Sequence, residues 1–257
     1  MYTSYTIGMK QTLNTKPFVS LITPTYNRAR FIPTLIQCIS HQDYPKEKME
    51  WIVYDDGSES VEQLFSDVKK SFPNFRYIYE PVKMNIGGKR NRLNKEAKGD
   101  IIIAMDDDDY YPPQRVSHVI AKFKQNPAYE LAGSSEVYMY YTDIKTIYRL
   151  GPYNKNHATN GTMAWRKSYS QAHTYDETVT HAEEKSFLES YRHPMIQLDP
   201  MKVMLVMAHP ENTFNKKAMR EQTDNKFVAK TQLKLNAFIK ETPIRQFYMN
   251  LDLTKVT

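Results

Sequence analysis

The sequence predicts an α/β fold in which a mostly parallel sheet is flanked by helices. In its first half, short apolar runs typical of strands alternate with segments whose apolar residues recur at helical spacing. One run, IIIAM at 101–105, is continuously apolar, as expected for a strand buried on both faces of a sheet. With 257 residues, 40% of them hydrophobic and 25% charged, the chain is long enough to bury one large core.

The predicted elements follow one another regularly up to residue 105. A β-branched apolar strand at 18–23 stops at Pro24, and a helix with apolar residues at helical spacing follows at 31–40. Further predicted strands are 51–54, 75–79 and 101–105, and further predicted helices are 61–72 and 89–98.

The second half of the chain is less regular. Pro112 and Pro113 begin a helix, and residues 130–150 are β-rich and rich in tyrosine. A loop containing Gly161 comes next. A helix at 183–191, a strand at 203–208 and a helix at 231–240 complete the predicted elements.

Composition and charge narrow the class of partner. The net charge of +6 arises from 35 Lys and Arg against 29 Asp and Glu, which favours an anionic ligand such as a nucleotide. The basic residues are scattered and form no dense stripe, so we expect no nucleic-acid partner. Cys38 is the only cysteine, which excludes an intramolecular disulfide and a cysteine-rich zinc site.

Cysteine usage and hydropathy also bear on location. A single cysteine fits a reducing compartment, and no apolar stretch approaches the length of a membrane span. The polar stretch at 1–16 lacks the hydrophobic core of a signal peptide. We therefore expect a cytoplasmic protein without a transmembrane segment, and the sequence leaves peripheral membrane contact and oligomerisation open.

Four aspartates, Asp106 to Asp109, come directly after the strand at 101–105. Side chains alternate along an extended segment, so Asp106 and Asp108 are expected to point the same way and to face one ion. Hard oxygen ligands suit Mn²⁺ or Mg²⁺, and such an ion could bridge a diphosphate. The alternative is a solvated acidic turn in which Asp109 caps the following helix.

Polar clusters at other strand ends are expected to converge on the same place. Asp55 and Asp56 are placed to accept hydrogen bonds from a base or ribose, although Asp-Gly is also common turn chemistry. The sequence PTYNR at 24–28 offers hydroxyl, aromatic and cationic groups that could border a nucleotide. Gly88 allows a tight backbone path, and Arg90 brings positive charge to a helix start, where anions bind favourably.

In order, VSLITPTYNR, WIVYDDGS and GGKRNRLNKEAKGDIIIAMDDDD closely resemble the family 2 glycosyltransferases of the GT-A (Rossmann-like) fold, over about the first 115 residues. The resemblance implies an inverting transfer of a sugar from a nucleotide-sugar donor. It implies that Asp55 and Asp56 contact the nucleoside, usually uridine, and that Asp108 is the direct metal ligand. The predicted donor-site residues are Thr23, Pro24, Thr25, Tyr26, Arg28, Asp55, Asp56, Gly88, Arg90, Asp106 and Asp107.

The resemblance also implies a general base and a histidine ligand. The family supplies the base from an acidic pair at a helix start, which THAEEKSF matches with Glu183 and Glu184. Adjacent helical residues do not share a face, so one of them reaches the acceptor. The alternative is two surface glutamates that stabilise the first turn of a helix. His209 is placed to join Asp106 and Asp108 on the metal, or it is a structural histidine.

NGTMAWRKS resembles the loop and strand that shape the sugar and acceptor pockets of the family, with Gly161, Thr162 and Trp165; Trp165 could equally be core. We thus predict one GT-A domain over residues 1–224, with a nucleotide-binding half (1–115) and a sugar and acceptor half (116–224), followed by a helical extension (225–257). The predicted partners are a UDP-sugar and a carbohydrate or glycoconjugate acceptor. The alternatives are a sugar nucleotidyltransferase and a non-catalytic carbohydrate-binding or nucleic-acid-binding module.

Overall fold

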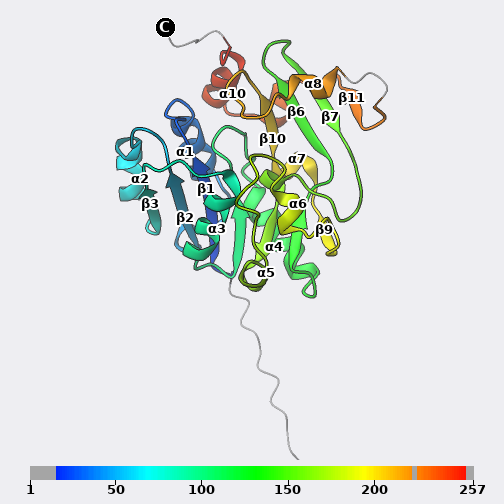
Figure 1. Ribbon diagram of the computed structural model, residues 1–257. Coiled ribbons are helices and arrows are strands. Elements are labelled where there is room, and N and C mark those ends of the chain that lie inside the picture. The colour runs from blue at the N-terminus through cyan, green and yellow to red at the C-terminus, as the bar shows by residue number, and fades with distance from the viewer. Residues whose placement is uncertain (1–15, 222–224, 253–257) are drawn as a thin grey trace, which may run out of the picture.

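A computed structural model describes residues 16–221 and 225–252 of the chain (Figure 1). The predicted absence of a signal peptide concerns residues that lie largely outside these ranges. Within them, seven strands form the main sheet: β1 (Val19–Thr25), β2 (Met49–Asp55), β3 (Phe75–Tyr79), β4 (Ile101–Ala104), β5 (Leu131–Gly133), β8 (Ala164–Arg166) and β9 (Met195–Gln197). Their order is β3-β2-β1-β4-β8-β5-β9. The first four are parallel, and β8 runs antiparallel to β4 and β5, so the predicted mixed, mostly parallel sheet is confirmed.

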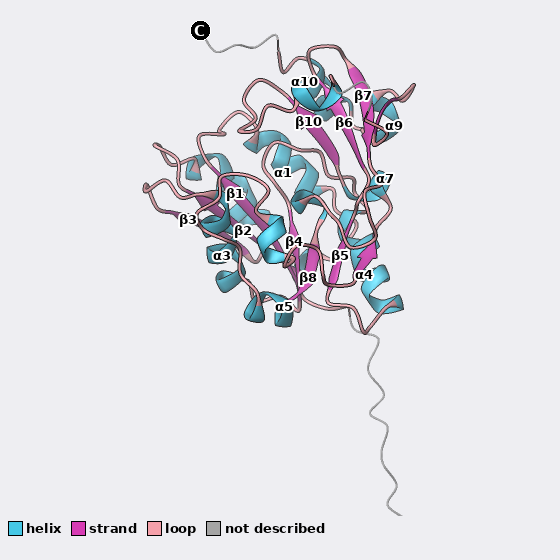
Figure 2. Cartoon of the chain, turned by 45° about the vertical axis from the view of Figure 1, so that its right-hand side comes forward, coloured by secondary structure: helices cyan, strands magenta, loops and turns pink. Residues whose placement is uncertain are grey.

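Helices cover both faces of this sheet (Figures 1 and 2). Side-chain alternation along β1 explains why: Val19 and Leu21 belong to one buried apolar cluster, and Ile22 belongs to a second cluster on the other face. The helices of the described ranges are α1 (Ile32–Ser40), α2 (Ser66–Ser71), α3 (Ile86–Glu96), α4 (Arg115–Gln125), α5 (Lys167–Ala172), α6 (Glu184–Phe187), α7 (Pro200–Val203), α8 (Lys217–Arg220), α9 (Leu235–Phe238) and α10 (Thr242–Met249), with 3-10 turns at Lys46–Lys48, Glu62–Phe65 and Asn160–Thr162. None of these helices has the length and apolar character needed to cross a membrane.

A second, four-stranded sheet stands beside the main one. Its strands are β6 (Val137–Tyr141), β7 (Thr146–Leu150), β10 (Leu205–Ala208) and β11 (Val228–Lys230), in the order β10-β6-β7-β11. An isolated bridge joins it to the residue that follows the acidic run, because Tyr110 and Leu205 exchange backbone hydrogen bonds of 3.1 and 2.9 Å. The acidic run therefore lies between the two sheets.

Two predicted helices differ from the structure. The helix expected at 231–240 forms only as the single turn α9, because Thr231 is extended and donates its backbone N–H to Ile147 O at 3.0 Å. The helix expected at 183–191 stops at Phe187, because Glu189 and the two residues after it have positive φ. Helix α10, which begins at Thr242 followed by Pro243, was not predicted.

Residues on both sides of the predicted boundary at 224 contribute to one structure. Strand β11 lies beyond that boundary and pairs with β7, which lies before it. Helix α10 contacts α1 at the edge of the main sheet. The division into 1–224 and 225–257 stays a prediction about the organisation of the chain.

Candidate active site

A cleft of about 930 Å³ opens beside the carboxyl ends of β1 and β4. Its walls come from the loop after β1, the acidic run after β4, the start of α3, residues 180–184 before and at α6, and the segment after β10. The carboxyl ends of parallel strands meet at one edge of a sheet, which is where ligands bind in folds of this kind. The predicted convergence of the β1 and β4 clusters is therefore seen in the structure.

Asp108 lines this cleft, and His209, which is buried behind the lining, lies next to its carboxylate. His209 Nε2 lies 3.1 Å from Asp108 Oδ2, and Asn212 Nδ2 donates to the same oxygen at 3.2 Å. Burial by itself would raise the pKa of Asp108, but the hydrogen bond from His209 and the charges of Lys216 and Arg28 outweigh burial and lower it. Asp108 is thus an ionised carboxylate at neutral pH.

The imidazole of His209 is fully buried and packs against Phe31, with ring centroids 4.9 Å apart. Burial lowers the pKa of His209, although the hydrogen bond to Asp108 acts in the opposite direction. A neutral imidazole is the form that binds metal ions. Asp108 Oδ2 and His209 Nε2 lie 3.1 Å apart, and a carboxylate with an imidazole suits Mn²⁺, which would take the place of the hydrogen bond between them, with further oxygens from substrate and water.

Asp106 does not share this arrangement. Arg90 donates to both of its oxygens, with Nη1 to Oδ1 at 3.0 Å and Nη2 to Oδ2 at 3.3 Å. The predicted metal pair of Asp106 and Asp108 is thus not the pair that the side chains form, because the guanidinium already neutralises Asp106 and His209 is the partner of Asp108. The alternation of side chains along an extended segment predicts their direction, but the partners of Asp106 and Asp108 depend on Arg90 and His209, which come from other elements.

The other two aspartates of the run hold the surrounding strands. Asp107 accepts a hydrogen bond from the Thr25 hydroxyl at 2.6 Å, and burial raises its pKa to about 7. Asp109 accepts the backbone N–H of Met207 at 2.7 Å, and burial raises its pKa to about 8. The alternative in which Asp109 caps the next helix is wrong, since α4 has Gln114 at its N-cap and no side-chain cap.

Arg90 connects the acidic run to the predicted base. It is buried on α3, and its Nε donates to Glu183 Oε1 at 2.8 Å while the rest of the guanidinium binds Asp106. The amide oxygen of Asn160, in the orientation that satisfies its hydrogen bonds, lies 2.8 Å from Arg90 Nη1. Arg90 was predicted to bind the donor, and in the structure its guanidinium links Asp106, which follows β4, to Glu183, which precedes α6.

Glu184 differs from its neighbour Glu183. Glu183 is paired with Arg90, whereas within the described ranges no salt bridge or side-chain hydrogen bond joins Glu184 to another residue. Burial, reinforced by the charge of Glu183, raises the pKa of Glu184 to about 7. A carboxylate with this pKa in a cleft has the properties of a general base.

The aspartates after β2 lie beneath the cleft and not on its wall. Asp55 is 1% exposed and accepts the backbone N–H of Gly57 at 2.9 Å, so it holds the turn. Asp56 accepts from Lys89 Nζ at 2.8 Å and from the backbone N–H of Met84 at 2.7 Å. Both carboxylates are engaged by groups of the protein and neither lines the cleft, so their contact with a nucleoside stays a prediction.

The loop after β1 does reach the cleft, as predicted. Pro24, Thr25, Tyr26 and Arg28 all line it. Lys83 Nζ lies 4.6 Å from the centroid of the Tyr26 ring. An aromatic face next to a lysine suits a base and its phosphates.

Several predicted site residues belong to the core instead. The Thr23 hydroxyl accepts from Trp51 Nε1 at 3.0 Å, and Thr162 accepts the backbone N–H of Ser134 at 2.9 Å. Trp165 is fully buried against Phe187, so it offers no face to a sugar. Gly161 lines the cleft, whereas the predicted site residues that do not line it are Thr23, Asp55, Asp56, Gly88, Thr162, Trp165 and His209.

The cleft residues that sequence reasoning missed include Lys83, Asn160 and Asn212. Asn212 follows His209 by three residues, a spacing typical of a turn that could have been noted in the sequence. In the structure its backbone N–H donates to His209 O, and its side chain donates to Asp108. The other two follow from tertiary packing and carry no local pattern in the sequence.

The chain matches the family model described as Glycosyl transferase family 2 over residues 20–183, and it belongs to that family. WcaA from Escherichia coli (strain K12) is 32% identical over 114 residues, which are 44% of this chain and 40% of the relative. The poly(ribitol-phosphate) beta-N-acetylglucosaminyltransferase TarS from Staphylococcus aureus (strain Mu50 / ATCC 700699) is 34% identical over 94 residues, which are 35% of this chain and 16% of the relative. The chain therefore spans less than half the length of these curated relatives.

Solved glycosyltransferases share the fold. The mannosyltransferase PcManGT from Pyrobaculum calidifontis, in complex with GDP-Man and Mn²⁺, superposes with a TM-score of 0.61 at 16% identity, covering 77% of this chain and 59% of that chain. TarS in complex with UDP-GlcNAc superposes with a TM-score of 0.56 at 17% identity, covering 76% and 60%. The predicted family, the GT-A fold and the glycosyltransferase class are confirmed.

Proposed function

We propose that this protein transfers a sugar from a nucleoside diphosphate sugar to a hydroxyl group of a carbohydrate or glycoconjugate acceptor, with inversion at the anomeric carbon. A UDP-sugar is the donor that we favour, and Mn²⁺ or Mg²⁺ is the ion. Family membership supports the general reaction, and the chemistry of the cleft supports the roles of its residues.

The donor side of the proposal rests on the acidic run and the loop after β1. Asp108 and His209 would hold the divalent ion, which supplies positive charge to the leaving diphosphate. Tyr26 offers a ring for the base, and Arg28, 3.8 Å from Asp108, adds positive charge near the same place. The ion and Arg28 would thus provide positive charge for a donor diphosphate beside the acidic run.

The acceptor side rests on Glu184. Inversion by a single displacement requires one base to take the proton of the attacking hydroxyl. The carboxylates of the cleft in the described ranges are Asp106 to Asp109, Glu183, Glu184 and Glu211, and the hydrogen bonds and ion pairs of the structure engage all of them except Glu184. This difference is the observation that carries the proposal.

Burial raises the pKa of Glu184 to about 7. A base whose pKa is close to the working pH is both ionised in a large fraction of molecules and basic enough to accept the proton of the acceptor hydroxyl. Arg90 would hold Glu183 in place and so keep α6 oriented toward the cleft.

A screen of nucleotide sugars tests the reaction and the donor together. UDP-linked and GDP-linked sugars would be incubated with the protein and MnCl₂, with EDTA as the control. We expect release of a nucleoside diphosphate that depends on the ion. Release of pyrophosphate, or equal turnover in EDTA, would overturn the proposal.

A further inference from the structure

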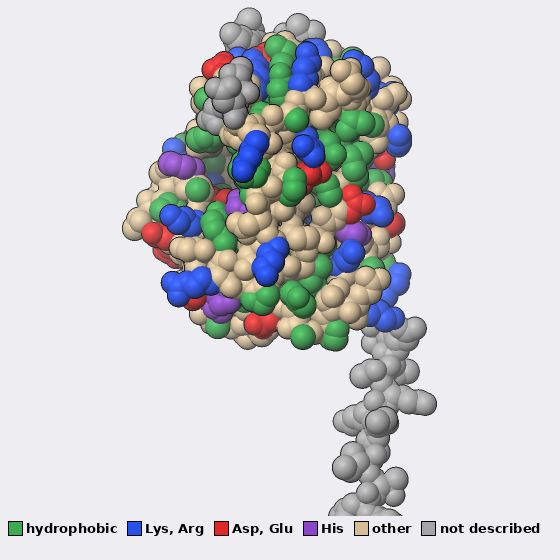
Figure 3. Space-filling model, turned by 90° about the vertical axis from the view of Figure 1, so that its right-hand side faces the viewer, with side chains coloured by type: hydrophobic (Ala, Val, Ile, Leu, Met, Phe, Trp, Pro, Cys, Tyr) green, Lys and Arg blue, Asp and Glu red, His purple; other side chains and the backbone are tan. Residues whose placement is uncertain are grey.

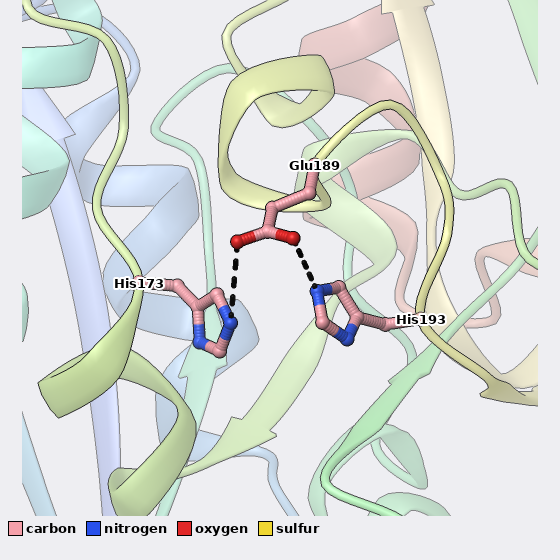
Figure 4. Close-up of side chains that lie close together, drawn as sticks. All are labelled: His173, Glu189 and His193. Atoms are coloured by element: carbon pink, nitrogen blue, oxygen red, sulfur yellow. Dashed lines mark ion pairs between the residues drawn. The ribbon is translucent and has the colours of Figure 1, made fainter.

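A second cluster of metal-binding side chains lies outside the cleft, at His173, Glu189 and His193 (Figure 4). His173 follows α5, and the other two lie in the segment between α6 and β9. Within the described ranges this is the one group of three or more His, Cys, Asp or Glu whose ligand atoms all lie within 4.8 Å of one another. None of the three lines the catalytic cleft.

The carboxylate of Glu189 stands between the two imidazoles. Its Oε2 lies 3.2 Å from His193 Nε2, and its Oε1 lies 3.6 Å from His173 Nε2, so each oxygen faces one ring (Figure 4). Two ligands bound at about 2.0–2.1 Å to a tetrahedral Zn²⁺ are separated by roughly 3.3 Å. The two separations lie on either side of that distance, each at a different oxygen of Glu189, and one ligand atom from each residue lies within 4.8 Å of the other two.

Both imidazoles are held in place by contacts on their other sides. His173 Nδ1 lies 3.0 Å from the carbonyl oxygen of Tyr169, which directs Nε2 toward Glu189. The Tyr169 ring stacks on His173 with centroids 4.0 Å apart and meets His193 edge-on at 5.3 Å. Metal-binding histidines are usually oriented in this way, by a carbonyl or carboxylate on the second nitrogen.

One polar atom of the cluster has no hydrogen bond. His193 Nε2 is buried and unsatisfied, although Glu189 Oε2 is 3.2 Å away. The ion pair with Glu189 is its only polar contact in the described part of the chain, and a bound ion is one of the explanations for a buried polar atom that lacks a hydrogen bond. Glu189 remains 47% exposed, so an ion has a route to the group.

The backbone that presents Glu189 is strained. Glu189, Ser190 and Tyr191 have φ values of 45°, 58° and 64°, all in the left-handed region. Each such residue costs on the order of 1–2 kcal/mol when it is not glycine. Conformations of this kind persist where the surroundings fix them, and a ligand bound by Glu189 would be one way to do so.

We propose that His173, Glu189 and His193 form a binding site for a borderline divalent transition metal, Zn²⁺ in the first instance. Two imidazoles and a carboxylate suit such an ion better than Mg²⁺, which prefers oxygen ligands. The site is separate from the Asp108 and His209 pair. An ion there ties the end of α5 to the turn after α6, on both sides of the segment that carries Glu184.

Zinc binding by the full chain tests this site. The Asp108→Asn variant removes the predicted metal ligand of the cleft, and calorimetric titration with ZnCl₂ is then carried out in that background. We expect one Zn²⁺ per chain, with affinity weakened by at least about 10–100-fold when His193→Ala or Glu189→Gln is added, since loss of a ligand should exceed loss of an outer-shell partner. MgCl₂ in excess should not displace the ion.

His41→Ala is the matched control, because His41 Nδ1 also lies near a glutamate, 3.9 Å from Glu241 Oε1, but has no second histidine beside it. Its zinc affinity should equal that of the Asp108→Asn background. Circular dichroism of each metal-free variant shows whether it folds, and Glu189→Gln keeps the test valid if His193→Ala does not. Zinc affinity unchanged by both substitutions, or absent in the Asp108→Asn background, would show that Glu189 only pairs with protonated histidines.

Discussion

The acidic run at residues 106–109 and the glutamate pair Glu183 and Glu184 both bring adjacent carboxylates into one cleft, but their surroundings differ. Every aspartate of the run is engaged by a cation, an imidazole, a hydroxyl or a backbone N–H. In the glutamate pair, Arg90 engages Glu183, whereas no side chain in the described part of the chain pairs with Glu184. The ionised Asp108 can bind an ion and the hydrogen-bonded Asp107 and Asp109 can orient strands, whereas a carboxylate of raised pKa such as Glu184 can accept a proton.

The largest effect is expected from removing the proton acceptor. Glu184→Gln keeps the size of the side chain but cannot act as a base, so the transfer rate should fall by roughly 10²–10⁴-fold. The rate would be measured at saturating donor and acceptor. Transfer at the wild-type rate would show that another group is the base.

The next largest effect concerns the metal. Asp108→Asn removes the ionised oxygen beside His209, so Mn²⁺ should be needed at a concentration on the order of 100-fold higher for half-maximal activity. Asp107→Asn is the control in the same run, because its carboxylate faces Thr25 and should not alter the requirement. If the Mn²⁺ requirement rises in Asp107→Asn and not in Asp108→Asn, then Asp107 and not Asp108 is the metal ligand.

The pKa of Glu184 predicts a pH profile. The raised pKa of about 7 means that Glu184 is protonated below pH 7 and is a base above it. We expect kcat to fall about tenfold per pH unit on the acid side and to level off on the alkaline side. Glu184→Asp should move the inflection downward, whereas Asp107→Asn should leave it in place. The opposite pattern would assign the inflection to Asp107, whose pKa is also about 7.

A smaller effect is expected from the paired glutamate. Glu183→Gln can still accept a hydrogen bond from Arg90 Nε, so it should lower the transfer rate by no more than about tenfold, far less than Glu184→Gln. The two rates measured side by side give the comparison. Equal losses would mean that the pair acts as a unit.

The smallest effect on activity is expected at Trp165, for which the sequence left a place in the sugar and acceptor pockets and a place in the core both open. Trp165→Phe should reduce the free energy of unfolding by about 1–3 kcal/mol, through a cavity and a lost hydrogen bond to Asn94, without changing KM. Tyr26→Ala, an aromatic residue of the cleft wall, should raise KM for the donor with less effect on stability. Urea unfolding and steady-state kinetics on both variants separate the two kinds of aromatic residue.

Local patterns account for much of the fold. The run at 101–105 is buried on both faces, as its continuous apolar character predicts, because β4 lies between β1 and β8 at the centre of the sheet. Helix 231–240 failed because Thr231 is bound to β7, a contact between residues 84 apart that no local window contains. The short strands after Gly133 depend on such contacts too, which explains why the second half was predicted less well.

At the site, the order of motifs in the sequence predicted which residues lie close together but not which side chains they pair with. Asp106, Asp108, Glu183, Glu184 and His209 all lie in or beside one cleft, as the motifs imply. Their partners could not be predicted, because Arg90 reaches Asp106 and Glu183 only through tertiary packing. The His173, Glu189 and His193 cluster shows no recognisable spacing in the sequence for the same reason.

Figure 3 shows how charged side chains are distributed on one face of the molecule. Lys and Arg side chains are scattered over that face among acidic and hydrophobic ones, without the continuous stripe that binding to a polynucleotide requires. The buried cationic groups that matter for the proposed reaction, Lys89 and Arg90, lie inside the molecule next to Asp56 and Asp106.

The proposed reaction requires that Asp108 binds the metal and that Glu184 acts as the base. Calorimetric measurement of the affinity for a nucleotide-sugar donor in the presence of MnCl₂, for Glu184→Gln and for Asp108→Asn, tests this requirement most directly. We expect Glu184→Gln to bind the donor as tightly as the wild type although it does not transfer the sugar, and Asp108→Asn to lose metal-dependent binding. A loss of affinity in Glu184→Gln equal to that in Asp108→Asn would contradict the separate roles of the base and the metal ligand.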